Sequence, residues 1–411
     1  MTLSEELAWR GFTNQTTYKD ESALDQESIS FYFGVDPSSD SMTIGNLAAA
    51  MLVRHFIDHG HKAYLLVGGA TGMIGDPDGK KDERNLLTLD DIAHNKEAIA
   101  EQYKTVFAGK EFNVVDNYDW FKDINYIDFL RTVGKNVPLS QMLGRDFVQS
   151  RLGSDGSGIS YAEFSYSLIQ GYDFVHLQRE YGVSLQLCGA DQWGNSIAGV
   201  DLIRRLDNKE AHVYSTPLII NKATGQKFGK SENGAVWLDS NKTSVYAFYQ
   251  FWLNVDDESV YDLLKIYTLL SKEEIDKVHS ESEMNLSSRK SQKTLAHEVT
   301  ILVHGKERVE SVERVTGVLF GNTDFASLDE DDLDILSEEI PTITINDDGP
   351  TVTTTVVNSL VESQVASSNG EARRLIESGA ISVNGVKIDK DNYIVTTSLI
   401  KKGKNNFILV R

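Results

Sequence analysis

The chain of 411 residues is long enough to bury a large core and to form two or three domains. Its composition, 40% hydrophobic and 25% charged, is ordinary for a globular protein, and its single cysteine, Cys188, excludes an internal disulfide and suits a reducing cytoplasm. No apolar run is long enough to span a bilayer, residues 1–10 lack a signal-peptide pattern, and a net charge of −21 argues against nonspecific coating of nucleic acid.

The first strong pattern is a strand, a turn and a helix within residues 31–60. An apolar run ends at Asp36, and apolar residues then recur at helical spacing from Ile44 until Gly60 ends the helix. Gly45 lies in the first helical turn, where glycine costs stability unless something must approach the backbone closely. A helix N-terminus that follows a parallel strand attracts phosphate, but an ordinary strand-turn-helix fits this pattern equally well.

A continuous apolar run over 63–67 predicts a second parallel strand, followed by a glycine-rich loop over 68–77. The loop lacks the G-x-G-x-x-G dinucleotide fingerprint because Ala70 stands where glycine is needed, which disfavours a hydride-transfer enzyme. Asp76 at the strand end is either a turn former or a ligand-binding carboxylate. The polar loop that follows carries three cations, for which solvated charges are the ordinary explanation: Lys80, Lys81 and Arg84.

Helices are predicted over 88–108, 121–152 and 160–181, with a strand at 111–115. In the last of these helices Tyr166, Gln170 and Asp173 stand at i, i+4 and i+7, on one face. Seven residues of helix rise about 10 Å, comparable to the length of an amino acid with a large side chain. Such polar groups are poor core material unless they are hydrogen-bonded, although a solvent-facing stripe would show the same spacing.

The next predicted strand, 183–188, carries a polar residue, Gln186, inside an apolar run, which suggests a partner at the carboxyl edge of the sheet. The loop 189–195 then opens another helix. In it Asp191 is well placed as an N-cap or, alternatively, as an acceptor for sugar hydroxyls. A last short strand is expected at 217–220.

The loop 225–231 contains two glycines and two lysines, but the spacing between Gly225 and Gly229 is too short for a P-loop. It could still fold over phosphates.

The pattern from 243 to 320 is helical, with an aromatic cluster at 246–252 that we expect to be a core, and an acidic, linker-like stretch runs from 328 to 350.

The C-terminal tail differs in charge from the rest of the chain. Residues 371–411 hold eight Lys and Arg against four Asp and Glu, so the tail is basic on an acidic body. A helix is expected to start near residue 367 and to end at Gly379. Residues 381–388 predict a hairpin, because Asn384-Gly385 suits a type I′ turn.

Together these motifs resemble bacterial-type tyrosyl-tRNA synthetase, a class I aminoacyl-tRNA synthetase, over almost the whole chain. The motifs that carry the resemblance are Asp36-Pro37 with Thr43-Ile44-Gly45-Asn46, the loop 68–77, the stripe Tyr166/Gln170/Asp173, the loop 189–195, and Lys227 to Ser231. The tail from about Pro350 is similar to the RNA-binding module shared with ribosomal protein S4.

The resemblance implies an α/β protein: a Rossmann-like parallel-sheet catalytic domain, then an all-helical domain and a small α+β S4-like domain. The implied boundaries are 1–225 for the catalytic domain, 226–325 for the lysine loop and anticodon-recognition helices, 326–349 for an acidic linker, and 350–411 for the RNA-binding domain.

The implied activity is that of a tyrosine–tRNA ligase, which activates L-tyrosine with ATP and passes it to the 3′ end of tRNA(Tyr). ATP with Mg²⁺ is the expected co-substrate, with no tightly bound cofactor and no protein-held metal. The expected state is a cytoplasmic homodimer without membrane attachment.

By analogy, the residues implied for the tyrosine site are Tyr32, Asp76, Tyr166, Gln170, Asp173, Gln186 and Gln192. Those implied for ATP are Gly34, Asp36, Ser38, Gly45, Asp191, Lys230 and Ser231. Those implied for the chemical step, mostly on the pyrophosphate side, are Thr43, Asn46, Lys80, Arg84, Lys227 and Lys230.

Two positions depart from the family pattern: Thr43 replaces the first histidine of the His-Ile-Gly-His signature, and Phe33 stands where relatives often have a cysteine. Two rival hypotheses remain open from the residues alone. One is the sibling enzyme specific for tryptophan, against which the pair of Tyr32 and Asp173 argues because it suits a phenol. The other is an RNA-binding protein that kept the scaffold and lost activation, which Thr43 keeps in play.

Overall fold

The computed structural model describes residues 1–26, 28–77, 87–152, 158–220, 222, 225, 228–231, 234–321, 323–345 and 354–411, without the side chains of residues 146, 147, 230 and 231. The chain divides into two compact units. The first contains residues 1–244 and 251–303, and the second contains residues 245–250 and 304–411. No helix among the described residues is both long enough and apolar enough to cross a membrane.

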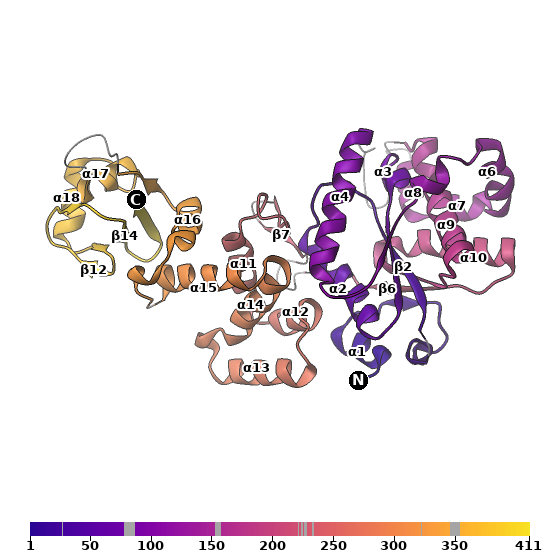
Figure 1. Cartoon of the computed structure of the whole chain (residues 1–411), viewed down its shortest axis with the longest axis horizontal. Helices are drawn as coiled ribbons and strands as arrows, with labels where there is room; N and C mark the ends of the chain where they lie inside the picture. The colour runs from indigo at the N-terminus through magenta and orange to yellow at the C-terminus, as the bar shows by residue number, and fades with distance from the viewer. Residues whose placement is uncertain are drawn as a thin grey trace. The chain divides into compact units, whose positions relative to one another are not determined.

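A six-stranded sheet forms the centre of the first unit, in the order β1-β6-β5-β2-β3-β4 (Figure 1). Its central strands are parallel, and only β1 pairs in the antiparallel sense, with β6. The chain order reverses between β2 and β5, and in open α/β sheets the ligand crevice lies beyond the carboxyl ends of the strands at such a switch point. The strands are β1 (Gln15–Thr16), β2 (Ser30–Val35), β3 (Lys62–Val67), β4 (Asn113–Asp116), β5 (Leu185–Gly189) and β6 (His212–Thr216).

Helices cover both faces of this sheet (Figure 1). The helices of this part of the chain are α1 (Leu3–Arg10), α2 (Ile44–Asp58), α3 (Gly69–Gly72), α4 (Leu89–Val106), α5 (Tyr118–Phe121), α6 (Tyr126–Thr132), α7 (Leu139–Leu143), α8 (Asp146–Leu152), α9 (Tyr161–Tyr181) and α10 (Trp193–Asp207). Alternate residues of β2 face opposite sides, as strand geometry requires. Phe31 packs on Phe56 of α2 with ring centroids 5.2 Å apart, whereas Tyr32 joins a core that includes Phe174 of α9 and Leu202 of α10.

Two glycines allow α9 and α10 to pack closely. A Cβ on Gly199 would lie 2.9 Å from the Cβ of Phe174, and one on Gly171 would lie 3.0 Å from Leu202 Cδ1. Real Cβ atoms do not tolerate the first of these distances, so both positions favour glycine. This contact sets the position of α9, the helix that carries the stripe Tyr166/Gln170/Asp173.

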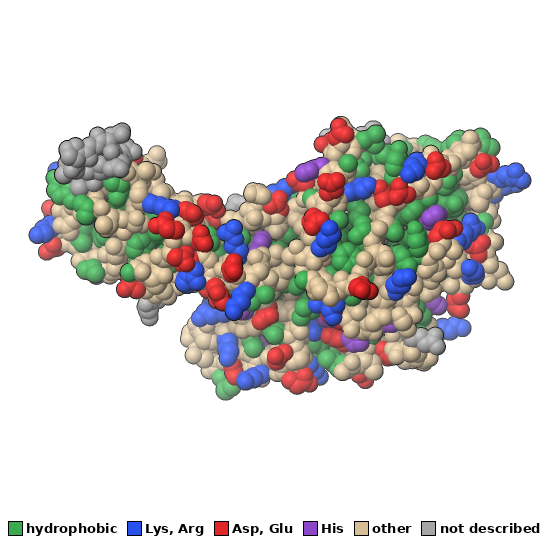
Figure 2. Space-filling model, viewed as in Figure 1, with side chains coloured by type: hydrophobic (Ala, Val, Ile, Leu, Met, Phe, Trp, Pro, Cys, Tyr) green, Lys and Arg blue, Asp and Glu red, His purple; other side chains and the backbone are tan. Residues whose placement is uncertain are grey.

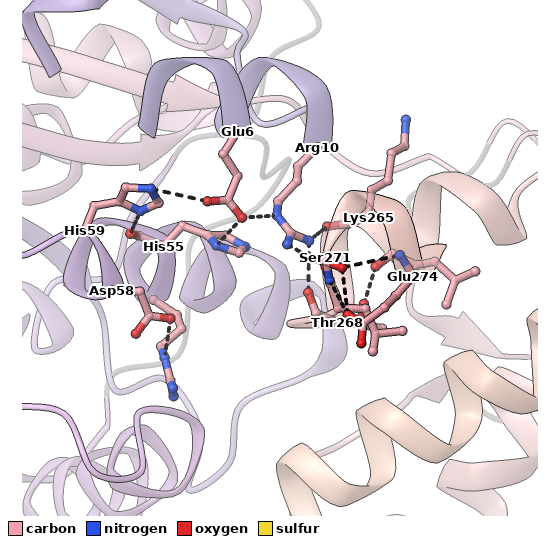
Figure 3. Close-up of polar contacts among 12 residues, drawn as sticks. Glu6, Arg10, His55, Asp58, His59, Lys265, Thr268, Ser271 and Glu274 are labelled. Atoms are coloured by element: carbon pink, nitrogen blue, oxygen red, sulfur yellow. Dashed lines mark hydrogen bonds and ion pairs between the residues drawn. The ribbon is translucent and has the colours of Figure 1, made fainter. Parts of the chain in front are cut away.

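The remainder of the first unit is a short hairpin and a set of helices. These are β7 (Lys230–Ser231), β8 (Gly234–Ala235), α12 (Val260–Tyr267), α13 (Lys272–Met284) and most of α14 (Lys290–His304), while α11 (Val245–Leu253) begins in the second unit. The end of α12 is held by Arg10, which donates to the carbonyls of Lys265, Thr268 and Leu270. Figure 3 shows Glu6 between Arg10 and the imidazoles of His55 and His59.

The second unit ends in a small α+β fold. Its helices are α15 (Lys306–Phe320), α16 (Glu330–Glu339), α17 (Val356–Glu362) and α18 (Asn369–Glu377). Its main sheet has the order β12-β11-β14-β15-β9, and a separate pair joins β10 to β13. The strands are β9 (Thr342–Ile343), β10 (Thr354–Thr355), β11 (Ile381–Val383), β12 (Val386–Lys387), β13 (Tyr393–Ile394), β14 (Ser398–Lys402) and β15 (Asn406–Val410).

Most of the elements expected from the sequence are present, and the predicted fold class is confirmed. In the tail hairpin Asn384 and Gly385 have φ of 48° and 80°, as a type I′ turn requires. Three details were wrong. The last strand of the parallel sheet is 212–216 and not 217–220; the N-cap of α10 is Gln192 and not Asp191; and the acidic stretch is folded, since it contains α16 and β9.

Candidate active site

A cavity of about 470 Å³ lies beyond the carboxyl ends of β2 and β5, at the switch point of the sheet. Its wall includes every sequence-predicted site residue whose side chain is described: Tyr32, Gly34, Asp36, Ser38, Thr43, Gly45, Asn46, Asp76, Tyr166, Gln170, Asp173, Gln186, Asp191 and Gln192. Lys80, Arg84 and Lys227 lie outside the described residues. Lys230 and Ser231 are described as backbone only, in β7.

Tyr32 and Gln186 are register partners on the adjacent parallel strands β2 and β5, so their side chains leave the sheet on the same face. Both are almost fully buried, and Tyr32 Oη and Gln186 Oε1 have no hydrogen-bond partner among the described residues. Gln170 Oε1 on α9 is in the same situation. Because buried polar atoms are nearly always hydrogen-bonded, three such atoms on residues that line one cavity indicate that a polar ligand supplies the partners.

Asp173 is fully buried at the end of the α9 stripe. Its Oδ2 accepts from Asn117 Nδ2 at 3.1 Å and its Oδ1 from Trp120 Nε1 at 2.9 Å. Burial raises the pKa of Asp173 well above its ordinary value, and the two donors act in the opposite direction by stabilising the ionised form. Burial, with Asp173 and Cys188 nearby, also raises the pKa of Tyr32 well above its ordinary value. The pair thus offers a buried acceptor beside a neutral phenol.

Asn117 and Trp120 are not among the site residues that the sequence predicts. Asn117 follows β4 directly, and a polar residue at the carboxyl end of a parallel strand was the available signal. Trp120 carried no comparable signal, because its indole reaches Asp173 across 53 positions of sequence.

Two further aspartates that line the cavity, Asp36 and Asp76, accept hydrogen bonds from other lining residues. Tyr166 Oη donates to Asp36 Oδ2 at 2.7 Å, and Gln192 Nε2 donates to Asp76 Oδ2. Burial first, and the negative charges of Asp36 and Asp76 second, raise the pKa of Tyr166 well above its ordinary value. Carboxylates at this spacing around a cavity attract an ammonium group or accept from hydroxyls.

The first turn of α2 forms another part of the wall. The backbone N–H and hydroxyl of Thr43 both donate to Asn46 Oδ1 at 2.9 Å, so the threonine sits at the helix start and orients Asn46. Among the described residues, a Cβ on Gly45 would meet only the Thr43 hydroxyl, at 3.5 Å. Packing within this part of the chain therefore does not require glycine here, and close approach by a ligand is a physical reason for it.

The lysine-loop backbone lies directly against that helix start. Gly229 has φ of 100°, and a Cβ on it would lie 2.9 Å from Ile44 Cγ1, so this position requires glycine. Ile44 N donates to Val236 O at 3.1 Å, and Val236 N donates to Gly229 O at 3.1 Å. Two motifs separated by about 180 residues in the sequence are therefore brought together at the phosphate-attracting end of a helix.

Comparison with known proteins agrees with this geometry. The family "tRNA synthetases class I (W and Y)" matches residues 24–321, and the C-terminal domain of tyrosine–tRNA ligases matches residues 332–411. Tyrosine–tRNA ligase 2 of Bacillus cereus is 43% identical over 100% of this chain and 99% of its own length, and the tyrosine–tRNA ligase of Bacteroides thetaiotaomicron is 41% identical over 100% and 99%.

Solved structures show the same likeness. A C-terminally truncated mitochondrial tyrosyl-tRNA synthetase of Aspergillus nidulans superimposes with a TM-score of 0.68 at 27% identity, covering 76% of this chain and 92% of its own. The corresponding protein of Coccidioides posadasii gives 0.66 at 30% identity, covering 76% and 91%. A tryptophanyl-tRNA synthetase of Encephalitozoon cuniculi, at 15% identity, shares the fold alone, with a TM-score of 0.54 over 81% and 91%.

A parallel sheet with its cavity at the switch point, and a glycine-containing helix start covered by a second glycine loop, define the class I synthetase architecture. Within that class, the chain belongs to the tyrosine–tRNA ligase family. Its reaction is the ATP-dependent activation of L-tyrosine to tyrosyl-adenylate, followed by transfer of tyrosine to the 3′ end of tRNA(Tyr). The full-length relatives are tyrosine enzymes, so neither the tryptophan alternative nor the non-catalytic alternative is retained.

Proposed function

We propose that the cavity binds tyrosine lengthwise along α9. Asp173 and Tyr32 contact the phenol hydroxyl, while Tyr166, Gln170 and Asp76 surround the ammonium group. Gln186 and Gln192 complete the tyrosine site. The observation that supports this most directly is that three residues lining the cavity carry buried atoms without a hydrogen-bond partner among the described residues: Tyr32 Oη, Gln170 Oε1 and Gln186 Oε1.

In the same proposal the nucleotide occupies the α2 side of the cavity. Asp36, Ser38 and Asp191 accept from or donate to the adenosine, and Gly34 and Gly45 leave room for its approach. The phosphates face Thr43, Asn46 and the cations of the two loops, namely Lys80, Arg84, Lys227 and Lys230, with Ser231 beside them. The likeness of the sequence motifs supports the assignment of these loop residues.

The chemical step needs no protein nucleophile. The tyrosine carboxylate oxygen attacks the α-phosphorus of ATP, a new O–P bond forms, and the bond to the bridging oxygen of pyrophosphate breaks with the electron pair leaving on pyrophosphate. The protein's contribution is to align the two reactants and to stabilise the developing negative charge. Mg²⁺ enters as part of the ATP co-substrate.

We assign the parts of the chain as follows: 1–225 for activation, 226–325 for the lysine loop and anticodon recognition, and 350–411 as an S4-like RNA-binding module, with 326–349 between them. The excess of cations in 371–411 supports contact with RNA phosphates. The location that suits a chain with one free, buried cysteine is the cytoplasm.

The same proposal includes a homodimer. Large apolar side chains stand exposed on α6, α7, α8 and the start of α9, and Figure 2 shows hydrophobic side chains at the surface around α6. Tyr126 and Tyr161 lie side by side, with their hydroxyls 3.4 Å apart. Exposed apolar side chains that form one patch typically mark an interface, and we propose that these residues form such a patch. The residues are Tyr126, Ile127, Leu139, Leu152 and Tyr161.

The test of the tyrosine assignment compares two ligands. Asp76→Asn removes the charge that faces the ammonium group, so the Kd of L-tyrosine should rise by about 10- to 100-fold. The Kd of 3-(4-hydroxyphenyl)propionate, which lacks the ammonium group, should change little. Equal effects on both ligands, measured by calorimetry on the folded variant, would reject the assignment of Asp76.

A further inference from the structure

A chain of hydrogen bonds leads from the cavity to Arg145, between α7 and α8. Gln192 Nε2 donates to Asp76 Oδ2, Asn195 Nδ2 donates to Gln192 Oε1 at 3.1 Å, and Arg145 Nη1 donates to Asn195 Oδ1. These four residues come from three segments that are distant in sequence: the loop after α3, the start of α10, and the connection between two short helices. Asp76 and Gln192 line the cavity, whereas Asn195 and Arg145 lie behind them.

The direction of every bond in this chain is determined by its two ends. Arg145 can only donate and an ionised Asp76 can only accept. The carbonyl oxygen of Asn195 therefore faces Arg145, which turns its amide nitrogen toward Gln192. The carbonyl oxygen of Gln192 then faces Asn195, and its amide nitrogen faces Asp76. A cation at one end and a carboxylate at the other thus hold two neutral amides in a single orientation.

Each end of the chain is anchored in the fold. Arg145 Nη2 also donates to Gly194 O at 2.7 Å, and the carbonyl of Arg145 accepts from Gln149 N at 3.0 Å. Asn195 is 3% exposed, so turning its amide by about 180° would bury its NH₂ group against the N–H of Arg145, with two donors facing each other and no acceptor between them. Ser196 Oγ donates to Gln192 O at 2.9 Å and so holds the backbone of Gln192, which is the next member of this series of hydrogen bonds.

We propose that Arg145 and Asn195 are positioning residues for amino-acid recognition: they fix the amide of Gln192 and, through it, the carboxylate of Asp76 that faces the substrate ammonium group. The proposal rests on the assignment of Asp76 made above. It extends that assignment to two residues that do not touch the substrate.

Asn195→Asp is the sharpest variant, because it nearly preserves shape and strengthens the contact with Arg145. Its carboxylate cannot donate to Gln192, however, so the Gln192 amide turns and presents oxygen to Asp76. A purely structural role for Asn195 would tolerate this change. The proposal predicts that the Kd of L-tyrosine rises by about 10-fold, the size expected for losing a hydrogen bond to a charged group. The Kd of 3-(4-hydroxyphenyl)propionate should stay within about twofold of the parent value.

Arg145→Met provides a second variant that leaves Asn195 intact. It should raise the Kd of L-tyrosine by about three- to tenfold without affecting the desamino ligand, and Arg145→Lys, which keeps one donor and the charge, should recover part of the loss. The matched control is Gln141→Met. Gln141 joins the same parts of the fold, since its Nε2 donates to Asp201 Oδ2 of α10 at 3.0 Å, but it takes part in none of the three hydrogen bonds that lead from Asp76 to Arg145. Its binding constants should equal those of the parent.

The outcomes separate this proposal from the site assignment. Should Asp76→Asn fail to distinguish the two ligands, the assignment of Asp76 falls and the proposal falls with it. Where Asp76→Asn distinguishes them but Asn195→Asp and Arg145→Met leave tyrosine binding unchanged, or weaken both ligands equally, the positioning role alone is rejected. If Asn195→Asp does not fold, Arg145→Met gives the decision.

Discussion

Trp120 donates its indole N–H to Asp173 Oδ1 over 2.9 Å, and Asn117 donates to Oδ2. Each oxygen of this fully buried carboxylate therefore accepts one hydrogen bond from the protein. The remaining lone pairs of Asp173 are what a ligand can use. Since Asp173 lines the cavity beside Tyr32, these two donors favour its ionised form and leave the remaining acceptor positions for the predicted phenol contact.

Replacing Asp173 with alanine should abolish tyrosine activation or collapse the preference for tyrosine over phenylalanine. A site built to hydrogen-bond a hydroxyl rejects the analogue lacking it by about 10⁴–10⁵, a magnitude for which tyrosyl-tRNA synthetases are themselves the standard example. Pyrophosphate exchange with each amino acid measures the ratio. Glu180→Ala, which removes an exposed carboxylate from the same helix, is the control and should leave the ratio unchanged. An unaltered ratio in Asp173→Ala would remove this residue from the specificity site.

Trp120→Phe should move the acid limb of kcat/KM for tyrosine to higher pH. Burial already raises the pKa of Asp173, and the indole donor opposes this by favouring the ionised form, so its loss raises the pKa further. Activity requires the ionised acceptor and is therefore lost as pH falls through the folded-state pKa. At a pH on that limb, kcat/KM should drop by about 10-fold. A limb at the parent's position would show that another group controls it.

Thr43→Ala should slow adenylate formation by about 10-fold while leaving the Kd of tyrosine unchanged. The hydroxyl donates to Asn46 Oδ1, so the variant loosens a side chain on the proposed phosphate side. Thr43→Ser keeps the donor and should stay within about twofold of the parent. Single-turnover kinetics on folded protein measures both. Should Thr43→Ala and the parent form adenylate at the same rate, the threonine acts only as a helix-start residue.

A truncation before α16 removes α16 and β9 together with their partners β15 and Arg411, although it also removes Asp332, the partner of Arg314. Removal of 350–411 alone would strip β9 of its partner β15 and leave Asp334 without Arg411. A chain ending at residue 328 should keep adenylate formation within about threefold of the parent but should charge tRNA poorly, because it loses the phosphate contacts of the basic tail. Aminoacylation at two salt concentrations is the measurement. Normal charging by the truncated protein at moderate salt would contradict an RNA-binding role for the tail.

His55 should make the first unit less stable in mild acid. Burial, together with the positive charges of Arg10, His59 and Arg54, lowers the pKa of His55 well below its ordinary value. This effect outweighs the attraction of Glu6 for a protonated His55, because the Glu6 oxygen that faces His55 already pairs with Arg10 (Figure 3). Below about pH 6.5 the unfolded chain binds a proton that the folded chain does not, so stability falls as pH decreases, by on the order of 1 kcal/mol per unit. His55→Gln should flatten Tm between pH 6.5 and 5.0, whereas the exposed His94→Gln should not. If Tm of His55→Gln falls with decreasing pH as steeply as that of the parent, His55 is not the source of the acid sensitivity.

Local pattern in the sequence was enough for the elements that surround the site. The apolar runs of β2 and β3, the helical spacing of α2 and α9, and the Asn384-Gly385 turn are short-range features, and each is present where it was expected. The stripe of Tyr166, Gln170 and Asp173 lies on one face because helix geometry alone requires it, and that face lines the cavity.

Only the tertiary structure decided which partners these residues have. The contacts of Asn117 and Trp120 with Asp173 span 56 and 53 positions of sequence. The hydrogen bonds that connect Asp76 with Arg145 pass through Gln192 and Asn195, which are far in sequence from both Asp76 and Arg145. Periodicity reports which face a residue occupies and carries no information on which distant segment packs against it. A hydrogen bond needs both atoms within about 3 Å in the right direction, and only the folded backbone determines that.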